Sequence, residues 1–244
     1  MMAMVEGQAT DTDLGGAAEE LSRAALSLAR RFAAGASMWC IAPAWPSHAR
    51  HVAVEFVHPV IVGKKALPAI SVEGADAART LRLAARPGDV VLVAGPADDA
   101  VALDLLGRAE AWGLTRLWIG VGPRPTVGRA DHVIWAEGAD PALAARSGDL
   151  VLLYHLLWEL THVVFEHPGL LVDADSCPDQ VCITCSDEGR LGEVRTLLSG
   201  GMVEVIAGGS PETVDASLVD PVMPGDLLLI HAGVALTTIA SGPR

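Results

Sequence analysis

Short apolar segments alternate with helix-length amphipathic segments through the first two thirds of the chain, and this alternation constrains the fold more than any other feature. Apolar runs that predict strands occur at 38–42, 69–72, 89–94, 117–121 and 132–136. Helices are predicted at 14–35, 47–57, 75–85, 98–112 and 149–166. Strands that alternate with helices form a parallel sheet covered on both faces, so residues 14–170 are predicted to be a three-layer α/β/α domain.

The pattern changes after Leu171. Short strand-like runs follow at 193–198, 202–206, 213–218 and 227–231, and glycine-rich turns at 199–201, 208–211 and 224–225 separate them. Because no helical periodicity interrupts these strands, residues 181–240 are predicted to form a small β-barrel, joined to the first domain by a linker at 171–180. A domain of about 60 residues buries a marginal core, so docking on the first domain or on a partner should stabilise it.

The charge of the chain limits its partners. It has 17 basic and 30 acidic residues, a formal net charge of −13, which disfavours non-specific attraction to nucleic acid or to an anionic membrane. Residues 1–13 lack the basic start and apolar core of a secretory signal, and the most apolar run, 150–165, is too short and too polar to span a bilayer. We therefore expect a cytoplasmic protein whose partners are proteins, metals or small molecules.

Three of the four cysteines lie close together, at Cys177, Cys182 and Cys185. In the cytoplasm, clustered cysteines indicate metal binding, redox chemistry or catalysis more often than disulfides. The Cys182-x-x-Cys185 pair, with Cys177 upstream, fits a zinc site for which His231 is available as a fourth ligand. Structural zinc sites usually contain two such pairs, so redox chemistry and simple packing remain open.

Four blocks of the C-terminal segment carry a family resemblance. They are Cys182-Ile-Thr-Cys185, Glu193-Val194, residues 212–219, and the most specific block, Gly225-Asp-x-x-Leu-x-His231-x-Gly-x-Ala235. In these blocks the segment resembles the HupF/HypC family of nickel–iron hydrogenase assembly chaperones. The resemblance implies an OB-like barrel that works with a HypD-like maturation protein. It also implies that an iron centre bearing cyanide and carbon monoxide is passed to the hydrogenase large-subunit precursor.

The same resemblance implies a metal site. The family's iron-associated cysteine and histidine fall on Cys182 and His231, and a thiolate with one imidazole suits a low-spin iron that must later be released. Cys182 departs from the family pattern because it is internal, and Cys185 replaces an apolar position. The family's C-terminal helix also has no counterpart before Arg244. We therefore expect transient iron at Cys182 and His231, with zinc bound by these residues, Cys177 and Cys185 as the alternative.

The first domain carries a second resemblance, in residues 32–55, 88–92 and 154–166. These segments are similar to the sugar isomerase (SIS) fold, in particular to its phosphoheptose isomerase branch. The resemblance implies a homodimer, because this fold commonly pairs through its helices. It also implies that Glu55 and either His155 or His162 form the acid/base pair of an aldose–ketose isomerisation, with Ser47 and His51 binding the ligand.

The expected phosphate loop departs from the SIS pattern. Where that family has serine, threonine and glycine, this chain reads Ala94-Gly-Pro-Ala-Asp98-Asp99. Proline removes an amide donor, and two carboxylates repel a phosphate. We therefore predict an accessory protein of hydrogenase maturation rather than an enzyme, with a phosphosugar isomerase or phosphosugar-binding protein as the alternative.

A polar face on the last predicted helix of the first domain also needs an explanation. His155, Glu159, His162 and Glu166 share one helical face among apolar residues. They are either buried polar residues that form hydrogen bonds to the sheet or across a dimer, or the remains of a catalytic or ligand pocket. The histidines of the second helix indicate a solvated face, unless they converge with His155.

Overall fold

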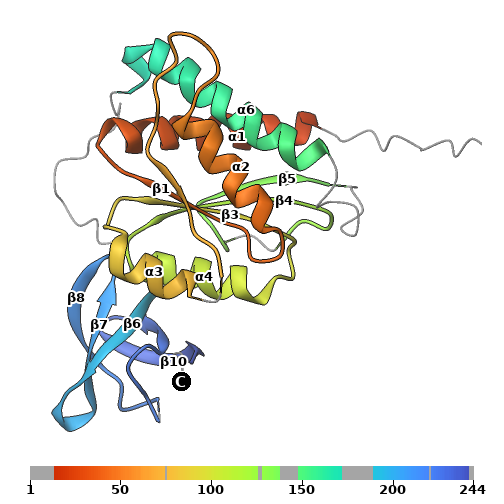
Figure 1. Cartoon of the computed structure of the whole chain (residues 1–244). Helices are drawn as coiled ribbons and strands as arrows, with labels where there is room; N and C mark the ends of the chain where they lie inside the picture. Colours follow the sequence, from red (N-terminus) through yellow and green to blue (C-terminus); the bar gives the residue numbers. More distant parts are fainter. Residues whose placement is uncertain are drawn as a thin grey trace, which may run out of the picture.

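The structure is a computed structural model, and it describes residues 14–74, 76–125, 128–137, 148–171, 189–219 and 221–241. A five-stranded parallel sheet with helices on both faces carries a closed β-barrel of five strands (Figure 1). The predicted three-layer α/β domain and the predicted barrel are both confirmed. Cys177, Cys182 and Cys185 lie outside the described residues, as does nearly all of the predicted linker.

The sheet has the strand order β2-β1-β3-β4-β5, and every neighbouring pair is parallel. Its strands are β1 (Met38–Ile41), β2 (Ala69–Ser71), β3 (Val90–Ala94), β4 (Thr115–Val121) and β5 (His132–Ala136). All residues of β3 are buried, which explains its continuous apolar sequence, since a central parallel strand is covered on both faces. Apolar and polar residues therefore do not alternate along this strand.

The helices divide between the two faces of the sheet (Figure 1). One face is covered by α1 (Leu14–Ala33), α2 (Pro46–Val57) and α6 (Gly148–Glu166), and the other by α3 (Ala77–Ala84) and α4 (Ala100–Ala111). Alternate residues of β1 point to opposite faces, so Cys40 joins the first core and Trp39 the second. None of the described helices combines the length and apolar character needed to cross a membrane.

The barrel has the strand order β10-β8-β7-β6-β9. Its strands are β6 (Arg190–Leu197), β7 (Met202–Ala207), β8 (Ser210–Asp215), β9 (Leu227–His231) and β10 (Val234–Ala240). Gly208 and Gly209 form a two-residue turn, so β8 begins earlier than the sequence pattern predicts. The unpredicted strand β10 follows a second two-residue turn, Ala232-Gly233, in which both residues have positive φ angles.

The barrel packs beneath α3 and α4, where β6 and β7 contact α4 (Figure 1). Leu227 of β9 belongs to the same apolar core as α3 and α4, so the two domains share buried surface. Gly107 in α4 permits this approach, because a Cβ atom there would lie 3.2 Å from Leu227 Cδ2. The docking of the barrel on the first domain gives its small core the additional burial that the sequence suggested it needs.

Candidate functional site

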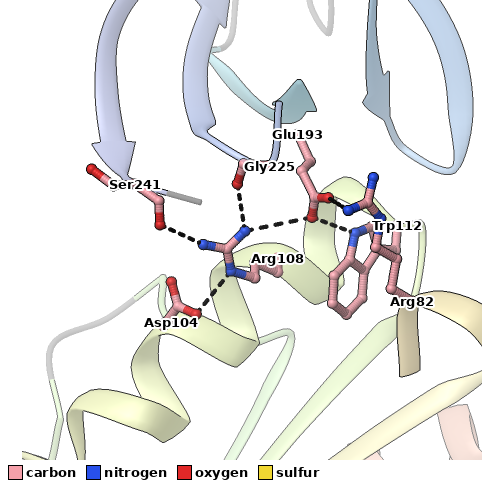
Figure 2. A network of polar contacts seen from close by, with 7 residues as sticks. All are labelled: Arg82, Asp104, Arg108, Trp112, Glu193, Gly225 and Ser241. Atoms are coloured by element: carbon pink, nitrogen blue, oxygen red, sulfur yellow. Dashed lines mark hydrogen bonds and ion pairs between the residues drawn. The ribbon is translucent and has the colours of Figure 1, made fainter. Parts of the chain in front are cut away.

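A polar network, here called the seam network, joins the two domains (Figure 2). Arg108 of α4 is buried, and its Nη1 and Nη2 donate to the carbonyls of Gly225 and Ser241 at 2.8 and 3.0 Å. Its Nε donates to Asp104 at 2.8 Å, one turn earlier on the same helix. A single guanidinium therefore holds two backbone carbonyls of the barrel against α4.

Glu193 of β6 completes the seam network from the barrel side (Figure 2). One of its carboxylate oxygens accepts from Trp112 Nε1 at 2.8 Å and lies 3.6 Å from Arg108 Nη1, and the other lies 3.0 Å from Arg82 Nη1. Buried charges are tolerated when they are paired and hydrogen-bonded in this way. Because protein groups occupy both oxygens, the seam network is suited to holding the domains together and not to catalysis.

A second group of polar residues, the α2–α6 cluster, consists of His51, Glu55 and His155. His51 and Glu55 lie one turn apart on α2, and His155 comes from α6. Glu55 Oε1 lies 3.3 Å from His51 Nε2 and 3.5 Å from His155 Nε2, and the two imidazole nitrogens are 3.4 Å apart. The packing of α2 on α6 thus unites three side chains that sequence analysis named for the first domain.

The separations within the α2–α6 cluster suit a tetrahedral metal ion. With Zn–N bonds of about 2.0–2.1 Å, the ligand atoms of a tetrahedral site lie about 3.3–3.4 Å apart. Within the described part of the chain, these three residues are the group whose donor atoms are close enough to share an ion. The side chains of His51 and His155 are 42% and 43% exposed, so solvent or a substrate could occupy a fourth position. Two imidazoles and one carboxylate with an open position form a donor set typical of catalytic zinc sites.

Tyr154 orients the cluster. Its hydroxyl lies 2.7 Å from His51 Nδ1. Burial, together with the negative charge of Glu55, raises the pKa of Tyr154 to about 12, so the phenol keeps its proton and its O–H can donate a hydrogen bond to Nδ1. This bond turns Nε2 of His51 toward Glu55, and when a metal binds Nε2 the hydroxyl oxygen can instead accept a hydrogen bond from Nδ1–H. This role is not evident from the sequence, although Tyr154 is the single tyrosine of the chain and precedes His155.

The polar face of α6 serves three purposes. His155 joins the cluster, whereas Glu159 and Glu166 both face Lys64, at 3.5 and 2.8 Å. His162 is buried, with one ring nitrogen 2.9 Å from the Trp158 carbonyl and the other 3.0 Å from the Lys65 carbonyl. His162 is thus a buried hydrogen-bonded residue, although its partners are its own helix and the segment before β2, whereas Glu159 and Glu166 are partly exposed partners of Lys64. A catalytic or ligand pocket that includes His155 stays a prediction.

Two of the predicted isomerase residues lie outside the cluster. His162 is part of the polar contacts between α6 and the segment before β2, not of the group around Glu55. Ser47 lies on the same face of α2 as His51, one turn earlier, and its side chain is exposed. Ser47 therefore lies near the cluster, where a ligand larger than a metal ion could reach it.

At the position of the phosphate loop of the SIS fold, a carboxylate of the chain itself occupies the backbone amides. Oδ1 of Asp99 accepts the backbone N–H groups of Val101 and Ala102 at 3.0 and 3.1 Å, which caps α4. The N-terminal amides that would bind an anionic ligand at this position are thus already used. The neighbouring Asp98 is exposed and adds a second negative charge.

His231 ends β9 at the turn before β10. It pairs with Val234 across Ala232 and Gly233, both of which have positive φ angles, 49° and 80°. The side chain of His231 is half-buried at this edge of the barrel. Because Cys182 lies outside the described residues, the iron site expected at Cys182 and His231 stays a prediction.

Comparisons with known proteins agree with this division into two domains. Residues 189–242, which contain all five barrel strands, match the HupF/HypC family. Comparison with curated proteins gives no significant match.

Solved structures resemble the first domain. A phosphoheptose isomerase from Francisella tularensis has a TM-score of 0.52 and 15% sequence identity, and the alignment covers 60% of this chain and 86% of that one. A phosphoheptose isomerase from Neisseria gonorrhoeae gives a TM-score of 0.48 and 14% identity, with coverage of 59% and 87%. At this identity the first of these likenesses shows a shared fold. The chain thus joins an α/β domain of the phosphoheptose isomerase fold to a C-terminal barrel that matches the HupF/HypC family.

Proposed function

We propose that this protein is an accessory chaperone of hydrogenase maturation, which binds a HypD-like maturation protein and a hydrogenase large-subunit precursor through its barrel. The observation that carries the proposal is the match of residues 189–242 to the HupF/HypC family, because it spans the whole barrel. The first domain acts in this proposal as a scaffold. The seam network supports that role, since it fixes one side of the barrel and leaves the other side for partners.

A groove on the barrel, lined by both apolar and polar atoms, supports partner binding. It has a volume of about 300 Å³ and lies at the start of β7, away from the seam network. Leu197, Leu198 and Val219 are among its lining residues, and the first two are about half exposed. Exposed apolar side chains gathered in one groove are typical of surfaces that bind other proteins. We place the contact with the maturation partner in this groove.

Cys182 and His231 are the residues that would hold iron during transfer. The decisive experiment is affinity purification of the tagged chain from a cell that makes hydrogenase, with Cys182→Ala, His231→Ala and the control His58→Ala. We expect His58→Ala to co-purify with the maturation proteins and to support hydrogenase activity, and Cys182→Ala to lose both. Retention of the same partners and the same activity by Cys182→Ala would contradict the proposal.

Metal analysis distinguishes iron carriage from the zinc alternative. A zinc site that includes Cys177 and Cys185 should lose its metal when either is replaced by alanine. Iron held by Cys182 and His231 should survive both of those substitutions. Measuring iron and zinc in the purified parent and in these variants therefore separates the two metals and the two ligand sets.

A metal-dependent sugar isomerase is the second candidate function, and the geometry of the α2–α6 cluster favours it. A divalent ion held there would polarise a carbonyl oxygen. Without the ion, Glu55 and His155, whose reactive atoms are 3.5 Å apart, are close enough to act on the same substrate as acid and base, so the metal and the acid/base pair are alternative uses of the same atoms. The carboxylate of Asp99 at the start of α4 weighs against a phosphorylated substrate.

A homodimer of the scaffold domain is part of the chaperone proposal, and the α2–α6 face is a candidate surface for it. Val54 of α2 and Leu152 of α6 are 54% and 41% exposed, and both helices carry residues of the cluster. Covering these apolar side chains with a second copy would also shield the cluster from water. Light scattering of the parent and of Leu152→Glu tests this arrangement: the parent should be a dimer and the variant a monomer.

Thermal-shift measurements test the isomerase itself. Binding to the native state raises the melting temperature, so both Zn²⁺ and a millimolar sugar, with or without a phosphate group, should stabilise an isomerase of this kind. His155→Ala should remove the response to zinc bound at the α2–α6 cluster. If neither free sugars nor sugar phosphates change the melting temperature of the zinc-loaded parent, the isomerase is excluded, whereas the chaperone proposal is unaffected.

A further inference from the structure

A cavity of about 610 Å³, here called the seam cavity, lies where the two domains meet. The carboxyl end of β1, the residues after β2, and the helices α3 and α4 form most of its wall. Ser241, which follows the last barrel strand, closes it from the other domain. Its size falls within the range of about 300–1,000 Å³ that is usual for small-molecule sites.

The position of the seam cavity within the sheet also suits a ligand. The strand order reverses between β1 and β3, because β2 lies on one side of β1 and the later strands lie on the other. In open parallel sheets the crevice outside the carboxyl ends of such strands is where ligands bind. The seam cavity opens beside this crevice, on the α3–α4 face of the sheet.

The wall of the seam cavity is mainly apolar. Its apolar lining residues include Ile41, Val72, Ala77, Ala78, Val101 and Leu105. The charged lining residues are Glu73, Asp104 and Arg108. Glu73 Oε1 lies 3.0 Å from Arg50 Nε, and Asp104 accepts from Arg108, so both carboxylates already have a cationic partner.

Arg108 is the cationic residue among these lining residues, and protein groups already engage it. Its Nε, Nη1 and Nη2 donate to Asp104, Gly225 and Ser241. Its Nη1 also lies 3.6 Å from a carboxylate oxygen of Glu193. Pro43 and Pro46, which also line the cavity, have no N–H group. Releasing Arg108 for a ligand would leave Glu193 buried without one of its partners, which is energetically unfavourable.

We infer that the seam cavity binds a small, uncharged and largely apolar molecule, and that it discriminates against phosphorylated ligands. The apolar wall supplies the affinity through removal of surface from water. The engaged arginine and the two carboxylates supply the discrimination, because an incoming phosphate would be desolvated without a counter-charge. This ligand class differs from the phosphosugar of the second candidate function, and the inference does not depend on the chaperone proposal.

Two probes that differ by a phosphate group test the inference on the full chain: indole and indoxyl phosphate. In NMR spectra of ¹⁵N-labelled protein, indole should shift the amide signals of Gly74, Ala78 and Leu105, which line the cavity. Indoxyl phosphate should bind about tenfold more weakly or worse, a difference of about 1.4 kcal/mol or more. Equal affinities for the two probes would overturn the discrimination against phosphate.

A matched pair of variants tests the location. Val101 is 60% exposed on α4 and lines the cavity, whereas Val62, in the loop after α2, is exposed and does not line it. Val101→Trp should fill the cavity and weaken indole binding about tenfold, whereas Val62→Trp should leave it unchanged. If both variants bind indole as the parent does, or if indole shifts amide signals elsewhere, the seam cavity is not the site.

Discussion

The seam network and the α2–α6 cluster are both built from charged and aromatic side chains of separate elements, but they differ in what remains available. In the seam network, the side chains of Arg108 and Glu193 are 6% and 3% exposed, and protein groups satisfy them. In the α2–α6 cluster, three donor atoms point at one another from partly exposed side chains. A polar group with a full set of internal partners stabilises the fold, whereas one with an open position can bind a ligand.

The difference predicts which measurement each region controls. Substitutions in the seam network should lower the free energy of unfolding and the cooperativity with which the two domains unfold. Substitutions in the α2–α6 cluster should change metal affinity and leave the free energy of unfolding almost unaltered. The following predictions test this separation, beginning with the largest expected effect.

Arg108→Met should have the largest effect on stability. It removes the donors to Gly225 and Ser241 and leaves Glu193 buried with fewer partners. Breaking a buried charge network from one side costs about 3–5 kcal/mol. We expect denaturant unfolding to show this loss and to separate into two transitions, because the barrel no longer unfolds with the first domain.

Arg195→Met is the matched control for this prediction. Arg195 lies on β6 of the barrel, where its pair with Glu204 is long, at 3.8 Å, and its side chain is 59% exposed. Exposed pairs of this kind contribute about 0–1 kcal/mol. If Arg108→Met and Arg195→Met lower the free energy of unfolding equally, the seam network is not what holds the domains together.

Gly209→Ala should have an intermediate effect. Its φ angle is +80°, and an added Cβ atom would lie 2.7 Å from Pro87 Cγ, across the seam. Gly208 has a φ angle of +56° but open space around it, so Gly208→Ala tests the backbone strain alone. We expect Gly208→Ala to lower the free energy of unfolding by about 1–2 kcal/mol, because alanine is strained in the left-handed conformation. Gly209→Ala should lower it by about 1–3 kcal/mol more, because its Cβ atom would overlap Pro87. If thermal or denaturant unfolding shows the same loss of stability for both variants, the turn at Gly209 is not in tight contact with the first domain.

The sequence predicts the architecture because the signals for it are local. Buried parallel strands are continuous apolar runs, as in β3, and the glycines at 208–209 mark a turn between two barrel strands. The start of β8 and the existence of β10 are harder to predict, because pairing with neighbouring strands decides them. Pro211 lies within β8 although it looks like part of the turn.

The sites depend on contacts between distant residues and are predicted less completely. The helical periodicity places His155 and His162 on one face of α6. The packing of α2 against α6 then brings His51 next to His155 and not next to His162. Asp104 and Arg108 read as an ordinary surface pair on a helix, and nothing in the sequence links them to Glu193. Residue types therefore indicate candidates for a site, and tertiary packing decides which candidates meet.

Tyr154→Phe should have the smallest effect on stability and a clear effect on metal binding. The phenylalanine keeps the packing of the ring but removes the hydroxyl that lies 2.7 Å from His51 Nδ1. Losing this one hydrogen bond costs about 1 kcal/mol of stability. Loss of a hydrogen-bond partner behind a metal ligand weakens metal affinity about 10–100-fold, so zinc titration by calorimetry should show a large change.

The comparison of Tyr154→Phe with His155→Ala separates orientation from ligation. His155→Ala removes a donor atom and should abolish zinc binding, whereas Tyr154→Phe should weaken it and retain the same stoichiometry. If Tyr154→Phe binds zinc as tightly as the parent, the hydroxyl does not orient His51, and the donor geometry is set by the packing of α2 against α6 alone. If neither variant differs from the parent, the α2–α6 cluster is a second structural network and the contrast with the seam network fails.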